Sequence, residues 1–183
     1  MFVVSPIVCN VKISFIVKTH SLIRRMEMLK YVTKKTQTYY IIKNIYTYTI
    51  YRNAFEYKKS FIVNITGIKD FSEILRAVRH FQSFAPVECE CVKIDNSTAF
   101  GRYLGSIDFA LIKLCLDNSQ EFKYNCHLFP GCFVRLRNRK NIIIFKSGKY
   151  NIIGCKSREE IKLCFKEIVN IFKKYNDLLT SRV

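Results

Sequence analysis

The stretch Asn64-Ile65-Thr66-Gly67-Ile68-Lys69 recurs 87 residues later as Asn151-Ile152-Ile153-Gly154-Cys155-Lys156. The same spacing of 87 residues carries Glu73-Ile74 onto Glu160-Ile161. Two matches at one spacing indicate that the second half of the chain repeats the first.

A third match supports the repeat at the start of each half. Ile7-Val8-Cys9-Asn10 corresponds to Lys93-Ile94-Asp95-Asn96 at a spacing of 86 residues. Three matches in the same order favour a tandem duplication of a unit of roughly ninety residues, and two copies are too few for a solenoid. We therefore expect two repeats, 1–86 and 87–183, that fold together as one pseudo-symmetric unit.

Each repeat combines predicted helices with predicted strands. Apolar residues three and four apart predict a helix after each Gly-x-Lys sequence and an earlier helix in each half. These helical patterns cover Phe71–Phe81, Ile161–Tyr175, Leu22–Leu29 and Ile107–Cys115. Runs rich in β-branched and aromatic residues predict strands. These runs are Phe2–Val17, Tyr39–Tyr51, Phe61–Ile65, Val87–Ile94, Cys132–Leu136, Ile142–Phe145 and Tyr150–Ile153. We expect an α+β fold with helices on one face of an antiparallel sheet, so apolar residues on the open face would form a partner surface.

The charge of the chain points to a polyanionic partner. The 183 residues include 31 Lys and Arg against 14 Asp and Glu, which gives a formal net charge of +17. Such self-repulsion favours a nucleic acid or an anionic membrane surface as partner. The alternative is a generically basic protein from an AT-rich genome. No apolar run reaches the ~20 residues that span a bilayer, and the first residues lack a signal-peptide pattern, so we expect an intracellular protein with no membrane partner.

Metal binding, cofactors and catalysis find little support. In an intracellular protein, the eight cysteines should be reduced and mostly buried. Cys89-x-Cys91, and Cys126-His127 with Cys132, lack the paired spacing of a zinc site. The histidines stand apart, and no nucleophile, phosphate-loop or metalloprotease motif occurs. We expect no metal, no cofactor and no catalytic residue, and hence no enzyme.

Two phenylalanines near turns suggest a surface for nucleic acid. Leu128-Phe129-Pro130-Gly131 places Phe129 on a tight turn, and Phe145 ends an apolar strand before Gly148. Beside Arg135, Lys146 and Lys149, these rings would form an apolar wedge with a cationic rim, as minor-groove binders use. Alternatively, Phe129 folds back on the core as a loop anchor.

The ordered series Leu128-Phe129-Pro130-Gly131, Arg135, Ile144-Phe145-x-Ser147-Gly148-Lys149, Gly154-x-Lys156 and Glu160-Ile161 is similar to the second repeat of the TATA-box-binding protein family. The resemblance extends weakly through the first half. It implies a saddle in which a curved antiparallel sheet carries helices on its convex face. It also implies binding and bending of AT-rich promoter DNA in the minor groove, as a first step of a transcription initiation complex.

The resemblance implies a set of DNA-binding positions. Phe129 and Phe145 would insert between bases, and Asn10 and Asn96 would donate to the acceptors of A·T pairs. The remaining positions face the groove or the DNA backbone, and they are Thr66, Thr98, Ile143, Arg135, Lys69, Lys149 and Lys156. The resemblance does not decide which rings of the first repeat would insert between bases, and the candidates are Tyr39 and Phe55.

Departures from the family pattern qualify these expectations. Ile153 stands where a second Thr would face the groove, and Tyr124–His127 has lost the two carboxylates that contact transcription factor IIB.

The expected partners are double-stranded AT-rich DNA, IIB-like and IIA-like general transcription factors and the RNA polymerase machinery. The expected location is the nucleus, or a viral transcription compartment. The alternative is a basic binder of this fold without sequence preference or with a regulatory role. A third reading is an enzyme on a similar fold, which a carboxylate cluster would favour.

Overall fold

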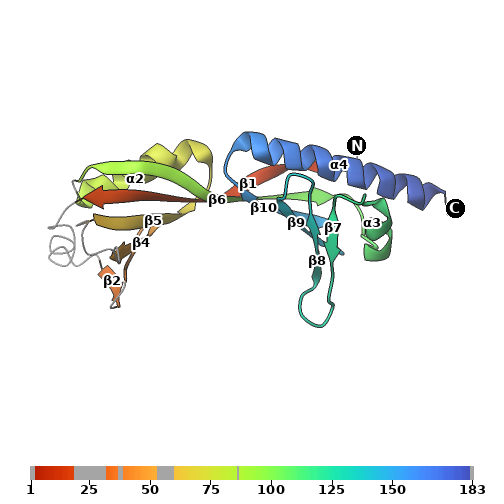
Figure 1. Cartoon of the computed structure of the whole chain (residues 1–183), viewed down its shortest axis with the longest axis horizontal. Coiled ribbons are helices and arrows are strands. Elements are labelled where there is room, and N and C mark those ends of the chain that lie inside the picture. The colour runs from red at the N-terminus through yellow and green to blue at the C-terminus, as the bar shows by residue number, and fades with distance from the viewer. Residues whose placement is uncertain (1–2, 19–31, 37–38, 53–59, 86, 182–183) are drawn as a thin grey trace. The chain divides into compact units, whose positions relative to one another are not determined.

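The chain folds as two compact units of strands and helices (Figure 1). The computed structural model describes residues 3–18, 32–36, 39–52, 60–85 and 87–181. The N unit comprises residues 10–96, and the C unit comprises residues 1–9 and 97–183. Two long strands, β1 (Val3–Lys18) and β6 (Cys89–Tyr103), therefore run through both units. The repeat limits 1–86 and 87–183 stay a prediction.

The N unit holds a sheet covered by one helix. Its strands are hydrogen-bonded in the order β2-β3-β4-β5-β1-β6. Their bounds are β2 Val32–Lys35, β3 Tyr39–Lys43, β4 Thr47–Arg52 and β5 Ser60–Ile68. The short helix η1 (Phe71–Glu73) leads into α2 (Ile74–Phe84), which lies along one side of the strands (Figure 1). The Phe81 ring of α2 packs edge-on against Phe15 of β1 at 5.3 Å between centroids, so the core forms between α2 and the sheet.

The C unit repeats this layering with two helices. Its strand order is β1-β6-β10-β9-β8-β7. The bounds are β7 Glu121–Lys123, β8 Gly131–Arg135, β9 Asn141–Phe145 and β10 Lys149–Cys155, with helices α3 Phe109–Cys115 and α4 Arg158–Thr180. Helix α4 lies along one side of the sheet (Figure 1). Phe172 of α4 stacks on Tyr103 at 4.8 Å, and the buried Tyr150 hydroxyl donates to the Val4 carbonyl oxygen at 2.7 Å.

The duplicated Gly-x-Lys sequence has one local structure in both units. Gly67 and Gly154 have φ of +89° and +91°, a left-handed conformation that glycine adopts without steric cost. The backbone N–H of Lys69 donates to Glu73 Oε2 at 3.3 Å, and the N–H of Lys156 donates to Glu160 Oε2 at 2.7 Å. The repeated residues therefore end a strand and start a helix in the same way.

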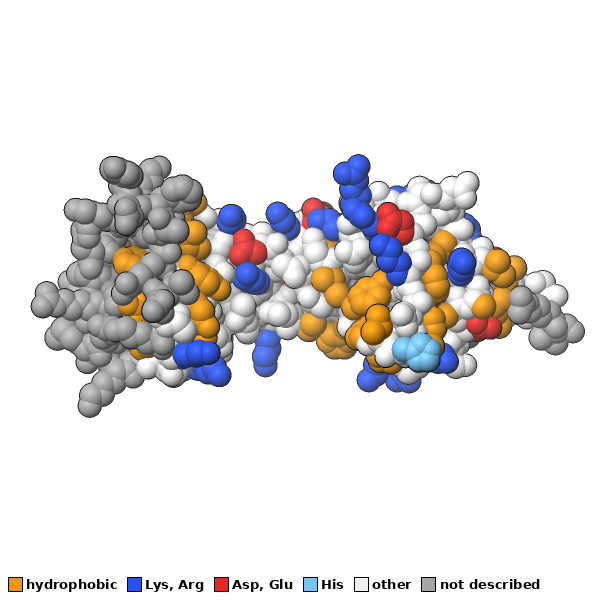
Figure 2. Space-filling view, turned by 60° about the horizontal axis from the view of Figure 1, so that its bottom comes forward, with side chains coloured by type: hydrophobic (Ala, Val, Ile, Leu, Met, Phe, Trp, Pro, Cys, Tyr) orange, Lys and Arg blue, Asp and Glu red, His pale blue; other side chains and the backbone are white. Residues whose placement is uncertain are grey.

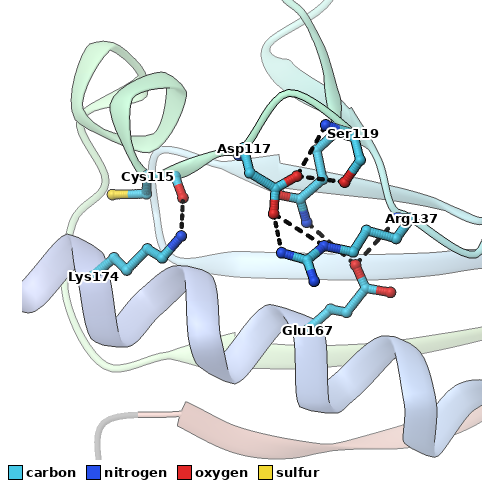
Figure 3. A network of polar contacts seen from close by, with 7 residues as sticks. Cys115, Asp117, Ser119, Arg137, Glu167 and Lys174 are labelled. Atoms are coloured by element: carbon cyan, nitrogen blue, oxygen red, sulfur yellow. Dashed lines mark hydrogen bonds and ion pairs between the residues drawn. The ribbon is translucent and has the colours of Figure 1, made fainter.

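A polar network ties the loops of the C unit to α4 (Figure 3). Arg137 Nε donates to Asp117 Oδ2 at 3.0 Å, and the Arg137 backbone N–H donates to Glu167 Oε2 at 3.2 Å. Hydrogen bonds from Ser119, followed by those from Arg137, lower the pKa of Asp117 to about 2. The network joins the loops after α3 and β8 to the helix layer, so it lies away from the open face of the sheet.

Most of the predicted elements are present. The helical patterns at 71–81, 107–115 and 161–175 and the predicted strands match observed elements. The run Tyr39–Tyr51 is divided by a turn into β3 and β4, while the short strands β2 and β7 were not predicted. The helix predicted at 22–29 lies outside the described residues.

The cysteines are only partly in the core. All eight are free, and the prediction that most are buried is wrong, because Cys9, Cys91 and Cys126 are exposed and Cys89 is only half-buried. Cys126 is exposed because it lies in the loop between β7 and β8. Burial raises the pKa of the Cys132 thiol to about 11. Within the described part of the chain, no three potential ligands gather as a metal site, and no helix is long and apolar enough to cross a membrane.

Candidate nucleic-acid interface

The face of the C-unit sheet that lies away from the helices presents rows of side chains. Alternate residues of each strand point to opposite faces, and Ile142, Ile144 and Ile152 are fully buried against the helices. The intervening residues form two rows across β6, β10, β9 and β8. The rows are Thr98, Ile153, Asn141 and Arg135, and Phe100, Asn151, Ile143 and Phe133. Figure 2 shows hydrophobic side chains gathered on this face with Lys and Arg side chains around them.

Three rings form an aromatic cluster at one edge of these rows. Phe129 lies 5.2 Å from Phe133 and 5.9 Å from Phe145 between ring centroids. Gly131 lies beneath them: a Cβ there would be 2.8 Å from Ile143 Cγ2 and 3.0 Å from a Phe129 carbon. Glycine is therefore needed for the rings to lie this close to the strand. Phe129 contacts the open face and is not a loop anchor on the core.

The turn after β9 places Phe145 at the end of its strand. The Gly148 N–H donates to the Phe145 carbonyl oxygen at 2.9 Å and closes the turn. The structure thus brings together Phe129 and Phe145, as predicted from sequence, and adds Phe133, whose side chain is 41% exposed. The sequence could have placed Phe133 on the open face, because Phe133 alternates with Cys132 and Val134, which are buried, along β8.

Cationic side chains border the open face. Lys149 and Arg102 are paired across β10 and β6, and both are exposed. Arg135 is exposed and lies 3.6 Å from the Glu121 carboxylate. Lys146 is also exposed, in the turn after Phe145. These groups can contact phosphates on either side of a groove. Arg102 was not predicted, because its place beside Lys149 follows only from the strand register.

Two further predicted cations lie at the strand-to-helix junctions. The Lys69 and Lys156 side chains are exposed, while their backbone N–H groups bind Glu73 and Glu160. Hydrogen bonds from the Lys140 side chain, and then from the Lys156 backbone, lower the pKa of Glu160. The carboxylates are thus held by the helix starts, and the ammonium groups remain at the surface.

The N unit carries a pair of tyrosines at the matching edge. Tyr39 and Tyr51 are cross-strand partners, and their centroids are 5.9 Å apart. Tyr51 lies four residues after Thr47, the partner of Thr66. Phe145 lies likewise four residues after Asn141, the partner of Ile153, which is the repeat equivalent of Thr66. Tyr51 is therefore the equivalent of Phe145 and was not predicted from sequence. Phe55 lies outside the described residues.

The two predicted asparagines lie in the long strands. Asn10 of β1 is exposed and Asn96 of β6 is half-buried, and both belong to the N unit. Thr98 follows two residues later in the first row of the C unit, where its carbonyl oxygen accepts from Cys9 Sγ at 3.3 Å. The predicted positions Thr66 and Ile143 lie on the open faces of the N and C units.

The loop between β7 and β8 presents no carboxylate. Tyr124 packs edge-on against Phe109 of α3 at 4.6 Å between centroids, and Leu128 is 82% exposed. The residues between them are Asn125, Cys126 and His127, all exposed. A basic partner surface would therefore find no charge partner on this loop.

Comparisons with known proteins show which sequences this chain resembles. Residues 91–175 match the family model described as transcription factor TFIID, or TATA-binding protein (TBP). The TATA-box-binding protein of Thermoplasma volcanium is 36% identical over 90 residues, 49% of this chain and 47% of that protein. That of Methanocaldococcus jannaschii is 34% identical over 83 residues, 45% of this chain and 44% of that protein. The chain aligns with about half the length of these relatives.

The fold is shared more widely than the sequence. The solved structure of Methanococcus jannaschii TBP matches with a TM-score of 0.73 at 23% identity, and the match covers 93% of this chain and 99% of that one. The predicted TBP-like α+β fold is confirmed. Residues 91–175 are thus similar in sequence to TATA-binding proteins, and the chain has the fold of a TATA-binding protein.

Proposed function

We propose that this chain is a TATA-box-binding transcription initiation factor, which binds and bends AT-rich duplex DNA through the open faces of its sheets. The observation that carries the proposal is the aromatic cluster Phe129, Phe133 and Phe145 beside exposed cations, on a sheet face that lies away from the described helices. A flat apolar surface excludes the guanine N2 amino group and favours A·T pairs in the minor groove. Rings at the edge of that surface can insert between bases and kink the duplex.

The charge of the chain supports the same partner. The net charge of +17 supplies sequence-independent attraction to phosphates, and the exposed side chains of Arg102, Arg135 and Lys149 lie close to the apolar residues of the open face. The family is one of DNA-binding factors, and we propose that the chain has no catalytic activity. The alternative, a binder without sequence preference, is favoured by the same charge but not by the apolar side chains of Phe100, Phe133, Ile143 and Ile153 on the open face.

The partners and the location follow from the proposed role. We propose that the DNA complex recruits IIB-like and IIA-like factors and the RNA polymerase machinery, in the nucleus or a viral transcription compartment. The relatives compared are archaeal, so the location rests on the sequence resemblance. Because Tyr124–His127 offers no carboxylate, a IIB factor from an unrelated organism should bind weakly. A pull-down on a DNA-bound complex tests this, and a normal ternary complex contradicts it.

A mobility-shift titration tests the proposed function. We expect a TATA duplex to bind at least about tenfold more tightly than a GC duplex of equal length, since one obstructed amino group costs about 1–3 kcal/mol. The titration is run at two salt concentrations, because cationic contacts weaken with salt for every sequence. Equal affinities for both duplexes would favour the binder without sequence preference.

A further inference from the structure

The open faces of the two units differ at matched positions of the repeat. Asn64 and Asn151 correspond in the duplication, and each has a cross-strand partner on its open face. The partner of Asn151 is Ile143, whereas the partner of Asn64 is Thr49. A hydroxyl in the N unit therefore stands where the C unit has an aliphatic side chain.

Two more positions show the same change. Ile153 of the C unit corresponds to Thr66 of the N unit, 87 residues earlier. On the other side of the two asparagines, Phe100 pairs with Asn151 and Ser14 pairs with Asn64. At three neighbouring positions, the C unit thus has Phe or Ile where the N unit has Ser or Thr.

The hydroxyls of the N unit can form hydrogen bonds with a ligand. Thr49 and Thr66 are half-buried, and neither side chain forms a hydrogen bond within the part of the chain that the structure describes. Ser14 is buried, and its Oγ donates to Asp95 Oδ1 at 2.8 Å, so the two threonines are the hydroxyls that a ligand can reach. Phe100 of the C unit is 47% exposed, and its ring offers no such group.

Hydroxyl and apolar side chains interact differently with the base pairs in the minor groove. A·T pairs present only acceptors, and a G·C pair adds the guanine N2 amino donor. A Thr hydroxyl can donate to the acceptors of A·T or accept from the amino group of G·C. An Ile or Phe side chain leaves that amino group without a partner, which costs free energy.

We propose that the two units have different base-pair specificity: the C unit is restricted to A·T pairs, and the N unit accepts both A·T and G·C pairs through Thr49 and Thr66. The inference rests on the proposed function, since it assumes that both open faces contact the minor groove. The preferred site would then be asymmetric, with one strictly AT-rich half and one half of mixed composition.

Selection from duplexes with a randomised central window tests the proposal, with sequencing of the bound fraction. For the wild type, we expect G·C to be depleted by about tenfold in one half of the selected site and by less than about threefold in the other. The double variant Thr49→Val/Thr66→Val keeps the branched side-chain shape and removes both hydroxyls. It should deplete G·C by about tenfold in the second half as well.

The reciprocal variant assigns each half of the site to a unit. Ile153→Thr introduces a hydroxyl into the C unit and should admit G·C in the half that excluded it. Thr180→Val, in the last turn of α4 on the helix side, is the matched control and should leave the selected sequences unchanged. Thermal unfolding checks that each variant folds, and Thr66→Val alone replaces the double variant if that one does not.

The outcomes separate this inference from the proposed function. Equal depletion of G·C in both halves of the wild-type site, or no change with the valine variants, would overturn the inference and leave TATA binding intact. Selection with no preference for A·T anywhere would overturn the proposed function itself.

Discussion

Replacing Phe129 or Phe145 by Ala should reduce both DNA affinity and DNA bending more than any other single change on the open faces. The two rings lie 5.9 Å apart at the edge of the C-unit sheet, and neither is fully buried in the protein. Insertion between bases would bury a Phe side chain, which contributes about 1.5–3 kcal/mol. At about 1.4 kcal/mol for each factor of ten, we expect affinity to fall about 10- to 100-fold.

The bend is measured by fluorescence energy transfer between dyes on the two ends of a TATA duplex, and the affinity by titration of the same duplex. Phe100→Ala is the matched control, because this ring lies on the same face with its side chain 47% exposed but outside the aromatic cluster. It should lower affinity less and leave the bend unchanged. Thermal unfolding corrects for the loss of ring contacts in the free protein. If Phe100→Ala straightens the DNA as much as Phe129→Ala, the rings are only part of a general apolar surface.

Three further predictions test other parts of the account. The double variant Tyr39→Phe/Tyr51→Phe should increase the DNA bend and raise DNA affinity up to about tenfold, since burying a hydroxyl without a partner costs about 1–3 kcal/mol. Fluorescence energy transfer measures the bend, and a smaller bend than that of the wild type contradicts the role of this pair. Lys149→Ala and Lys156→Ala should each lower the slope of log affinity against log salt by about 0.9 for every DNA sequence. An unchanged slope would show that the replaced lysine does not contact a DNA phosphate. The pKa of Asp117 is lowered to about 2 in the folded protein, so its stabilising effect is present above the ordinary value of 3.8 and disappears as pH falls through about 2. Asp117→Asn should therefore lower the unfolding temperature at pH 7 but hardly change it near pH 2, and equal losses at both pH values contradict this ion pair.

The sequence alone predicted those parts of the site that depend on local pattern. The helix 161–175 follows from apolar residues at helical spacing, and the duplicated Gly-x-Lys residues predicted matching strand-to-helix junctions. Phe129 and Phe145 were identified because each adjoins a turn that glycine or proline specifies. In each case the physical cause lies within a few neighbouring residues.

Other parts depend on which strands pair and in what register. Tyr51 is the partner of Tyr39 only because β3 and β4 form an antiparallel pair across a short turn, and the sequence suggested Phe55 instead. Arg102 lies beside Lys149 through pairing between strands 47 residues apart in the chain. The short edge strand β7 has three residues, too few to show an alternating pattern.

The central claim is that the open faces recognise AT-rich DNA from the minor groove, and duplexes that contain inosine test it most directly. Inosine lacks the N2 amino group of guanine, so an I·C pair resembles A·T in the minor groove and G·C in the major groove. We predict that a TATA duplex with all its A·T pairs replaced by I·C binds within about threefold of the original, while the same duplex with G·C pairs binds at least about tenfold more weakly. Equal weakening by I·C and G·C would contradict the account, because it would show that the protein reads the major groove.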